Sequence, residues 1–528
     1  MEISLLQKKR LAYKPIVPEV LKNLNEVVFK ETQEEDSQPN ETLRKLLPKT
    51  CDAHPFSLET GKRKERNRPL KIGAIFSGGQ ASGGHNVLAG LFYGMKEIDP
   101  LSKLYGFLNG PSGIVDNLKK ELSEQEIEAF MNQGGFDLIG TGRTKIETQE
   151  QLAASLQACK EGDLDGLAII GGDDSNTNAA ILAEYFLQHG CKTRVIGLPK
   201  TIDGDLQSRD IEISVGFDSA CKTYSEIIGN IARDALSAKK YYHFIKLMGR
   251  SASHITLECA LSTHPNLALI GEEKRSLNQI VEEIADLVCN RYEAGKEYGV
   301  ILIPEGLIEF IPEIQSLISS LNKGIAKNPA NPQAALEHLS QAEKTIFSSL
   351  NEKIQKQLLL ERDPHGNVQV SQIDTQVLLM DLVKKELKKR PGYKGKFSAQ
   401  EHFLGYEGRS CFPSNFDANY GYCLGLLAVL AIRDGLTGAI CSVQHLKESP
   451  LYWKMKMVPI IHLMHLEFRG GKEKPVIRKT LVDLHSKPFL RFLSHRKTWA
   501  MQDDYRYPGP IQFFGDPELT DAPPVVLQ

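Results

Sequence analysis

The sequence predicts an α/β fold built from parallel sheets with helices on both faces. Between residues 71 and 306, short and continuous apolar runs alternate with helix-like segments, which is typical of repeated strand–helix–strand units. The runs lack strict apolar–polar alternation, as expected of strands that are buried on both faces. Five of these runs end in glycines or polar residues, and ligands bind beyond the carboxyl ends of parallel strands. We therefore expect a binding site at those ends.

The elements follow in a definite order along the chain. Residues 1–69 are polar and charged, and we expect a partly helical extension that wraps another part of the protein or another subunit. Helical spacing in 178–190 predicts a helix that ends at Gly190. The expected strands lie within 71–79, 165–174, 193–201, 241–250, 267–273 and 298–306, and the sheet pattern resumes at 438–444.

These patterns divide the chain into four parts. We expect the extension (1–69), a Rossmann-like domain (70–240), a second α/β domain (241–310 and 401–528) and a mostly helical insertion (311–400). The insertion is predicted from apolar residues at helical spacing and from many good helix formers. A length of 528 residues agrees with two or three domains.

Composition narrows the class of protein. A net charge of −2 and an isoelectric point near 6.7 argue against a nucleic-acid binder. The longest apolar run, 425–432, is too short to span a bilayer, and the N-terminus lacks the apolar core of a secretory signal. Nine scattered cysteines indicate reduced thiols. We therefore expect a cytoplasmic protein that binds neither nucleic acid nor membrane.

The first candidate site is the loop SGGQASGGHN, residues 77–86. Glycines allow backbone N–H groups to approach an anion closely, and a following helix adds its positive end. The loop lacks the spacing of the dinucleotide fingerprint and of the P-loop. Phosphate binding and an ordinary tight turn both remain open for this loop alone.

The second candidate is GGDDSNTNAA, residues 171–180, in which Asp173 and Asp174 follow two glycines. One interpretation is helix capping, since Ser175, Asn176 and Thr177 are good N-cap residues. Another is that one carboxylate holds Mg²⁺, which prefers oxygen ligands and bridges phosphates, and that the other has a separate role.

The third candidate is PKTIDGDL, residues 199–206, which offers a lysine, a hydroxyl and two carboxylates. A lysine stabilises charge that develops on a transferring phosphoryl group. An aspartate accepts the proton of an attacking hydroxyl. A surface loop with solvated charges is the plainer alternative.

Together these motifs, with KKYYHFIKLMGRSASHI (239–255), PEGLIEF (304–310) and GYEGRS (405–410), resemble the long form of the pyrophosphate-dependent 6-phosphofructokinases. The resemblance covers about 71–410 and extends in texture to the C-terminus. It implies two Rossmann-like subdomains with the active site in the cleft between them. It also implies reversible, Mg²⁺-dependent transfer of a phosphoryl group from pyrophosphate to the 1-hydroxyl of fructose 6-phosphate.

The resemblance also implies roles for single residues. On the donor side, Gly79 contacts pyrophosphate, Asp173 binds Mg²⁺, and Asp203 is the proton acceptor, flanked at the substrate by Thr201 and Ile202. The first Rossmann-like domain thereby becomes the one that binds pyrophosphate and Mg²⁺, and the second the one that binds fructose 6-phosphate.

On the acceptor side, the implied residues line the sugar phosphate, with Arg250 as an anion clamp and Glu305 bonded to the sugar. They are Met248, Gly249, Arg250, Glu305, Tyr406, Glu407, Gly408 and Arg409. Lys240 and Tyr241 reach the site of a neighbouring subunit, which implies a homodimer. Outside this context each has a plainer interpretation, such as a surface ion pair, a helix cap, a loop residue or a solvated lysine.

Asp174 and Lys200 are the residues that the resemblance links to the choice of donor. ATP-using relatives have glycine at the position of Asp174, where a nucleotide needs room for its α-phosphate. Two unit charges about 4 Å apart repel by roughly 4 kcal/mol at an effective dielectric near 20. Asp174 therefore disfavours ATP but not pyrophosphate, and Lys200 offsets the added charge.

Two positions depart from the family pattern: Ser82 stands where proline is expected, and Asn109 where glycine is expected. Features of the sequence disfavour three other functions. Asp174 disfavours an ATP-dependent phosphofructokinase, and the presence of Asp173, Asp203 and Arg250 disfavours a non-catalytic regulatory subunit. The missing fingerprint disfavours a nicotinamide-dependent oxidoreductase.

Overall fold

The computed structural model describes residues 4–32, 41–63, 67–328, 331–360, 372–469, 472–509 and 517–527. The chain forms two compact units, and each is assembled from separate stretches. Unit 1 comprises Met1–Ala220, Tyr406–Thr480 and Ile511–Leu527, and unit 2 comprises Cys221–Gly405 and Leu481–Pro510.

Unit 1 is built on a nine-stranded sheet with the order β1-β2-β13-β12-β7-β6-β3-β4-β5. The strands from β12 to β4 run parallel, and β1, β2, β13 and β5 each run antiparallel to a neighbour. Strands β14 and β15 form a separate antiparallel hairpin. The bounds are β1 Val27–Glu31, β2 Phe56–Thr60, β3 Lys71–Phe76, β4 Lys103–Phe107, β5 Lys119–Glu121, β6 Gly166–Gly171, β7 Arg194–Pro199, β12 Ala439–Gln444, β13 Lys454–Pro459, β14 Met464–Arg469 and β15 Lys472–Ile477.

Ten α-helices lie wholly in unit 1 within the described residues. The predicted helix of 178–190 is the larger part of α7, which starts earlier than expected. The bounds are α1 Leu5–Leu11, α2 Glu41–Leu46, α3 Gly84–Ile98, α4 Pro111–Val115, α5 Glu124–Phe130, α6 Gln149–Glu161, α7 Asp173–Gln188, α16 Tyr406–Arg409, α17 Asn415–Arg433 and α19 Pro517–Thr520.

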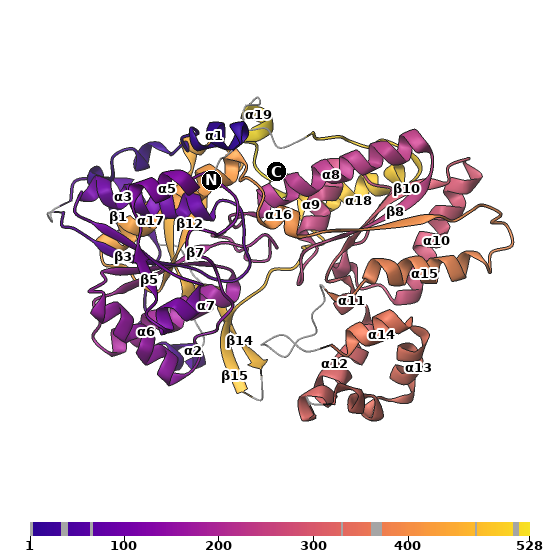
Figure 1. Ribbon diagram of the computed structural model, residues 1–528, viewed down its shortest axis with the longest axis horizontal. Coiled ribbons are helices and arrows are strands. Elements are labelled where there is room, and N and C mark those ends of the chain that lie inside the picture. The colour runs from indigo at the N-terminus through magenta and orange to yellow at the C-terminus, as the bar shows by residue number, and fades with distance from the viewer. Residues whose placement is uncertain are drawn as a thin grey trace. The chain divides into compact units, whose positions relative to one another are not determined.

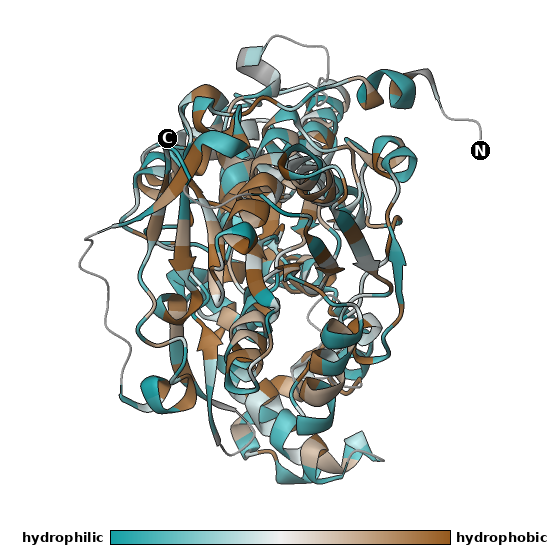
Figure 2. Ribbon diagram, turned by 90° about the vertical axis from the view of Figure 1, so that its left-hand side faces the viewer, coloured by the Kyte–Doolittle hydropathy of each residue, from teal (hydrophilic) through white to brown (hydrophobic). Residues whose placement is uncertain are grey.

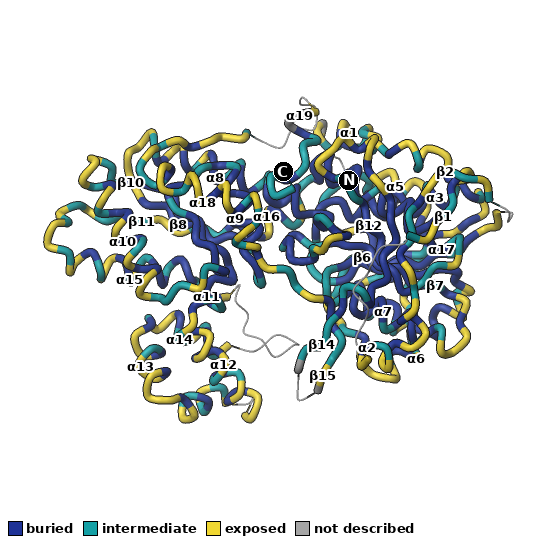
Figure 3. The backbone as a smooth tube through the Cα atoms, turned by 180° about the vertical axis from the view of Figure 1, so that it is seen from behind, coloured by how far each residue is buried: buried dark blue, intermediate teal, exposed yellow. Residues whose placement is uncertain are grey.

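Unit 2 contains a four-stranded parallel sheet with the order β11-β8-β10-β9. Helix α8 begins in unit 1 and continues into unit 2. The predicted insertion holds helices α12 to α15, in which buried and exposed positions alternate (Figure 3). The bounds are β8 Tyr241–Leu247, β9 Leu267–Ala268, β10 Tyr298–Pro304, β11 Ala399–Leu404, α8 Phe217–Ala238, α9 His254–Thr263, α10 Leu277–Glu293, α11 Leu307–Phe310, α12 Pro312–Lys327, α13 Gln341–Ser349, α14 Glu352–Leu358, α15 Thr375–Leu387 and α18 Lys487–Met501.

The predicted α/β class is confirmed, and the strands form for the expected reason. The central strands are almost wholly buried, including all six residues of β6 and all seven of β10. They are among the most hydrophobic segments of the chain (Figure 2). A strand that is buried on both faces has no solvent-facing side for polar residues, which explains why its apolar residues are continuous and do not alternate with polar ones. The run at 267–273 is an exception, because β9 has two residues and the chain then enters a 3₁₀ turn at Gly271–Glu273.

The observed units differ from the predicted domains in three places. Residues 406–480 and 517–527, which we expected in the second domain, belong to unit 1, and residues 221–240, which we expected in the first, belong to unit 2. Strand β12 pairs with β7, and helix α17 packs on α3, both within unit 1. The two helices approach closely at glycines: a Cβ on Gly90 would lie 2.2 Å from the carbonyl oxygen of Tyr422, and one on Gly425 2.3 Å from that of Val87. The missing side chains allow this contact, which fixes α17 in unit 1.

The N-terminal extension is also more regular than expected. Strands β1 and β2 pair with each other, and β2 extends the sheet by pairing with β13. Helix α1 is fastened to unit 1 by Asn132, whose amide donates to the carbonyl oxygens of Arg10 (3.1 Å) and Tyr13 (2.8 Å). The extension is therefore part of unit 1 and contributes two strands to its sheet.

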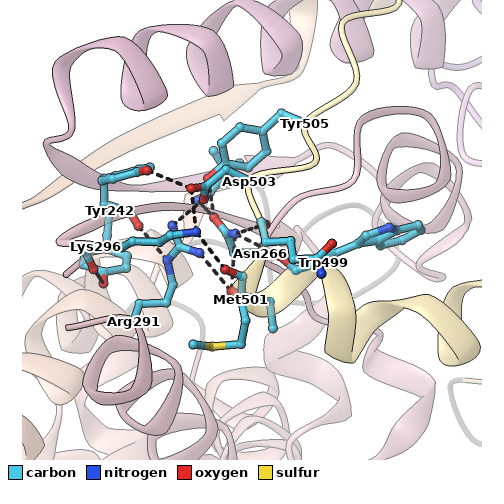
Figure 4. A network of polar contacts seen from close by, with 12 residues as sticks. Tyr242, Asn266, Arg291, Lys296, Trp499, Met501, Asp503 and Tyr505 are labelled. Atoms are coloured by element: carbon cyan, nitrogen blue, oxygen red, sulfur yellow. Dashed lines mark hydrogen bonds and ion pairs between the residues drawn. The ribbon is translucent and has the colours of Figure 1, made fainter. Parts of the chain in front are cut away.

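A buried polar network fastens residues 499–505 to unit 2 (Figure 4). The fully buried Arg291 pairs with Asp503 at 2.8 Å and donates to the carbonyl oxygen of Ala500 at 3.0 Å. Lys296 also pairs with Asp503 at 2.8 Å, and the Asn266 amide donates to the carbonyl oxygen of Trp499 at 3.0 Å. A buried charge needs partners of this kind, so the segment after α18 is held in one position.

Candidate active site

Three neighbouring parallel strands of unit 1 end side by side and bring three of the predicted motifs together. Strand β6 lies between β3 and β7. Beyond the strand ends the pairing continues: the Ser77 N–H donates to Ile170 O (2.9 Å), and the Lys200 N–H donates to Gly171 O (3.0 Å). The glycine loop, the aspartate pair and the lysine loop therefore meet at one edge of the sheet, as the sequence predicted.

The glycine loop after β3 has the shape of an anion-binding turn. Gly78 has a φ of +88°, and its N–H donates to the carbonyl oxygen of Gly142 (2.8 Å). A Cβ on Gly79 would lie 2.7 Å from a guanidinium nitrogen of Arg409, so a side chain there would displace the guanidinium. The loop thus holds the Arg409 guanidinium close to Gly79, and a guanidinium suits an anion.

The two departures from the family pattern have local explanations. Ser82 is fully buried, and its hydroxyl donates to the carbonyl oxygen of Cys411 at 2.5 Å. A hydrogen bond therefore fixes the loop at the position where a proline ring was expected. Asn109 has a φ of 61°, in the left-handed region that asparagine tolerates better than most residues with a side chain.

Asp173 and Asp174 form the first turn of α7, whose N-cap is Gly172. Because Gly172 has no side chain and Ser175 already lies inside the helix, the alternative interpretation of capping by Ser175, Asn176 or Thr177 does not apply. Both carboxylates instead lie at the positive end of the helix, which stabilises negative charge. The Asn176 amide fixes the turn by donating to the carbonyl oxygens of Gly171 (2.7 Å) and Gly172 (2.9 Å).

Lys200 is buried at the centre of this edge and is 3% exposed. Its ammonium donates to the carbonyl oxygens of Ser77 (2.9 Å) and Gly79 (2.6 Å). Burial, and then the positive charge of Arg409, lower the pKa of Lys200 to about 7 against the opposing effect of Asp203 and Asp173. Lys200 is therefore held against the anion loop, and its charge is sensitive to what binds there.

The loop after Lys200 presents further carboxylates. The Asp203 N–H donates to the Thr201 hydroxyl (3.1 Å), which shapes the turn, and Ile202 is buried. Asp205 is buried, and its pKa is raised to about 8 by that burial and by the negative charges of Asp203 and Asp173. The carboxylates of the second and third motifs therefore face one another.

Three polar groups near this edge were not picked out from the sequence. Arg143 lies close enough to lower the pKa of Lys200, and Lys479 lies 3.6 Å from an Asp173 oxygen. The buried Asp205 was seen only as an additional carboxylate. Asp205 belongs to the PKTIDGDL motif, whereas Arg143 and Lys479 lie outside the predicted motifs.

Helix α16 carries the YEGR motif and lies next to the glycine loop within unit 1. The Arg409 guanidinium donates to the side-chain oxygen of Gln80 and lies 5.6 Å from the centre of the Tyr406 ring. Tyr406 is 64% exposed, Glu407 is exposed and Gly408 is buried. The structure therefore groups Arg409 with Gly79 and Lys200.

The predicted residues of unit 2 form their own group at the ends of β8 and β10. Glu305 is fully buried, and its carboxylate accepts the N–H of Gly249 (3.0 Å). A Cβ on Gly306 would lie 2.2 Å from the carbonyl oxygen of Arg250, so the two strand ends are in direct contact. Met248 continues the pairing with β11 by donating its N–H to Leu404 O (2.9 Å).

Lys240 and Tyr241 do not join that group. They lie at the start of β8, whereas Arg250 follows its end, and seven strand residues span about 23 Å. Both side chains are exposed, and Tyr241 has a φ of 68°. Within unit 2 they therefore point to a different edge of the sheet from Arg250.

Among the described residues, no three histidine, cysteine, aspartate or glutamate side chains converge as a metal cage. Mg²⁺ does not require one, since one or two carboxylates and the phosphates of a substrate complete its shell. None of the described helices is long and apolar enough to cross a membrane.

Comparisons with known proteins identify the class of this chain. Two solved structures share the fold: pyrophosphate-dependent phosphofructokinases from Nitrosospira multiformis and Marinobacter aquaeolei, with TM-scores of 0.55 and 0.54 at 16% identity. The first match covers 86% of this chain and 97% of the other, and the second covers 83% and 93%. The family model described as Phosphofructokinase matches residues 71–432, more than half of the chain. The chain belongs to the phosphofructokinase family.

Relatives with assigned names are similar over the whole length. The pyrophosphate--fructose 6-phosphate 1-phosphotransferase of Treponema pallidum (strain Nichols) is 47% identical, and the match covers 100% of this chain and 97% of that protein. The protein of the same name from Porphyromonas gingivalis is 45% identical, with 100% and 99% covered.

Proposed function

We propose that this chain catalyses the reversible transfer of a phosphoryl group from pyrophosphate to the 1-hydroxyl of fructose 6-phosphate, giving fructose 1,6-bisphosphate and phosphate. The observation that carries this proposal is the full-length similarity, at 45–47% identity, to enzymes named for that reaction. The anion loop, the lysine and the aspartates at one sheet edge supply the chemistry it needs.

Pyrophosphate binds at the glycine loop. Its oxygens accept hydrogen bonds from the backbone N–H groups around Gly79, and the charges of Lys200 and Arg409 hold it there. Asp173 would hold Mg²⁺, which neutralises charge on the phosphates. The carboxylate oxygens of this edge suit that ion, and the negative charges of Asp203 and Asp173 add to the effect of burial in raising the pKa of Asp205.

Asp203 is the proton acceptor. As the sugar 1-hydroxyl attacks the nearer phosphorus, its proton passes to the Asp203 carboxylate and a new oxygen–phosphorus bond forms. The bridging bond of pyrophosphate breaks, and phosphate leaves. Lys200 stabilises the charge that shifts onto the leaving oxygen. In the reverse direction Asp203 returns the proton.

Asp174 sets the donor. Its carboxylate lies one residue from Asp173 in the first turn of α7 and adds negative charge where a nucleotide would place its α-phosphate. Pyrophosphate has no further phosphate and avoids the repulsion, which is worth roughly 4 kcal/mol at about 4 Å and an effective dielectric near 20.

The sugar phosphate is bound by the group at the ends of β8 and β10, with Arg250 as its anion ligand and Glu305 bonded to the sugar. Met248 and Gly249 belong to the same group in unit 2, and the family resemblance assigns Tyr406, Glu407 and Gly408 to the sugar phosphate. Lys240 and Tyr241 serve the site of a second copy in a cytoplasmic homodimer. Their exposure at the start of β8, away from Arg250, supports this assignment.

The purified protein with fructose 6-phosphate, Mg²⁺ and either pyrophosphate or ATP, coupled to detection of fructose 1,6-bisphosphate, tests the proposal. We expect turnover with pyrophosphate and little with ATP. Equal or better turnover with ATP would contradict the donor assignment, and no turnover with either donor would contradict the reaction.

A further inference from the structure

The segment after β15 runs along two elements of the candidate site. The Ile477 N–H donates to the Thr177 hydroxyl (3.1 Å), in the helix that begins with Asp173. The Thr480 N–H donates to the Asp205 carbonyl oxygen (2.8 Å), and its hydroxyl donates to the Gln207 carbonyl oxygen (2.7 Å). Figure 1 labels β15 and α7, which pack against each other. These bonds fix the backbone on both sides of Lys479.

The Lys479 ammonium lies among the carboxylates of the site. Its nitrogen is 3.6 Å from an Asp173 oxygen, and its charge lowers the pKa of Asp205. That distance allows an ion pair but exceeds the 2.7–3.2 Å usual for an N–H···O hydrogen bond. The side chain is 32% exposed, and lysine has a flexible stem, so the ammonium can move without disturbing the fold.

The negative charges of the site leave a role for a movable ammonium group such as that of Lys479. Pyrophosphate brings several negative charges to an edge that already holds Asp173, Asp174 and Asp203. Lys200 is buried and donates to two backbone carbonyl oxygens of the glycine loop, so its position is fixed. Lys479 is partly exposed and lies beside Asp173.

We propose that Lys479 is a pyrophosphate-binding residue that pairs with Asp173 in the free protein and transfers to a phosphoryl oxygen when a divalent cation takes that carboxylate. This inference rests on the proposed function. It has a consequence that a purely structural lysine lacks. In the free protein Lys479 and the metal compete for Asp173, whereas in the complex Lys479 and the metal both hold pyrophosphate.

Removing the charge at Lys479 should therefore change two affinities in opposite directions. We would compare Lys479→Met, Lys479→Arg and the control Lys474→Met in the full-length protein. Lys474 belongs to β15 and pairs with Glu147 at 3.4 Å, away from the site aspartates. Binding of Mn²⁺ without substrate is followed by the electron paramagnetic resonance of free Mn²⁺, and binding of pyrophosphate with Mg²⁺ by calorimetry.

For Lys479→Met we expect Mn²⁺ to bind roughly two- to fivefold more tightly, the range of an exposed ion pair. Pyrophosphate should bind at least about tenfold more weakly, the value of one charge-assisted hydrogen bond, with a matching rise in KM for pyrophosphate. Lys479→Arg should keep pyrophosphate binding within a few-fold of the unmodified protein, and Lys474→Met should change neither affinity.

Two results would overturn the inference. One is pyrophosphate affinity in Lys479→Met within twofold of the unmodified protein. The other is weaker binding of Mn²⁺ and pyrophosphate alike, which indicates a lysine that only holds the site in shape. If the unmodified protein itself fails to bind pyrophosphate, the proposed function fails as well, so the two failures are distinguishable.

Discussion

Replacing Lys200 with methionine tests whether pyrophosphate binding is coupled to proton uptake. Methionine matches the lysine stem in size but carries no charge. Burial lowers the pKa of Lys200 from 10.5 to about 7, a difference that corresponds to about 5 kcal/mol for charging the amine in place. A bound polyanion next to the ammonium favours the protonated form and raises this pKa again.

The size of the effect follows from these values. With a pKa of about 7, Lys200 in the free protein is about one-tenth protonated at pH 8 and about nine-tenths protonated at pH 6. If the bound state is fully protonated, binding takes up about 0.9 proton at pH 8 and about 0.1 at pH 6. The affinity for pyrophosphate should therefore fall as the pH rises above about 7.

Calorimetry of pyrophosphate binding in two buffers with different ionisation enthalpies measures this uptake. Pyrophosphate itself also titrates, so the informative quantity is the difference between the unmodified protein and Lys200→Met at each pH. Lys474→Met, on the surface of the same unit, serves as the control for loss of a lysine. Equal proton uptake in Lys200→Met and the unmodified protein at pH 8 would refute the coupling.

The remaining predictions concern donor choice, chemistry and stability. Asp174→Gly should admit ATP and lower turnover with pyrophosphate in steady-state kinetics with both donors, and an unchanged donor preference would remove its role. Asp203→Asn should lower kcat by about 10²–10⁴-fold, and a nearly normal kcat would eliminate it as the base. The pKa of the buried His85 is lowered by burial to about 4, so the unfolded chain binds the extra proton between pH 6.5 and 4. As the pH falls from 6.5 to 4, the free energy of unfolding measured by denaturant titration should therefore fall by up to about 3 kcal/mol. If His85→Phe leaves this dependence of the unfolding free energy on pH unchanged, His85 is not its origin. Arg291→Met should destabilise unit 2 by about 3–5 kcal/mol by leaving charge on Asp503, measured by denaturant unfolding, with partial recovery on adding Asp503→Asn; a loss below about 1 kcal/mol would show that the pair is dispensable.

The strands that carry the site could be predicted because they are buried on both faces. Strands β3, β6, β7, β8 and β10 are continuous apolar runs in the sequence, and each ends where its glycine or polar motif begins. The position of Lys200, Asp203 and Glu305 at strand ends follows directly from that pattern. Their chemical roles came from the family resemblance.

What could not be predicted depends on contacts between distant parts of the chain. The apolar run that forms β12 predicts a strand but does not show that this strand pairs with β7. The sequence therefore placed β12 in the second domain, whereas it lies in unit 1. Strands β1 and β2 each carry a hydrophobic face between charged residues. Whether these segments form strands depends on sheet partners that are distant in sequence. Lys479 lies 276 residues after Asp203 and stands in no recognisable motif.

Because unit 1 is built from separate stretches of the chain, some of its elements are synthesised long before the elements they pair with. Strand β7 ends at Pro199 and its neighbour β12 begins at Ala439, so 240 residues are translated before the two can pair. At 5–20 residues per second this takes roughly 10–50 s. During most of that interval the glycine face of α3 has no α17 to pack against, because most of unit 2 is synthesised before α17. A nascent chain stalled near residue 405 would expose this apolar surface to chaperones, although it already contains every aspartate of the site.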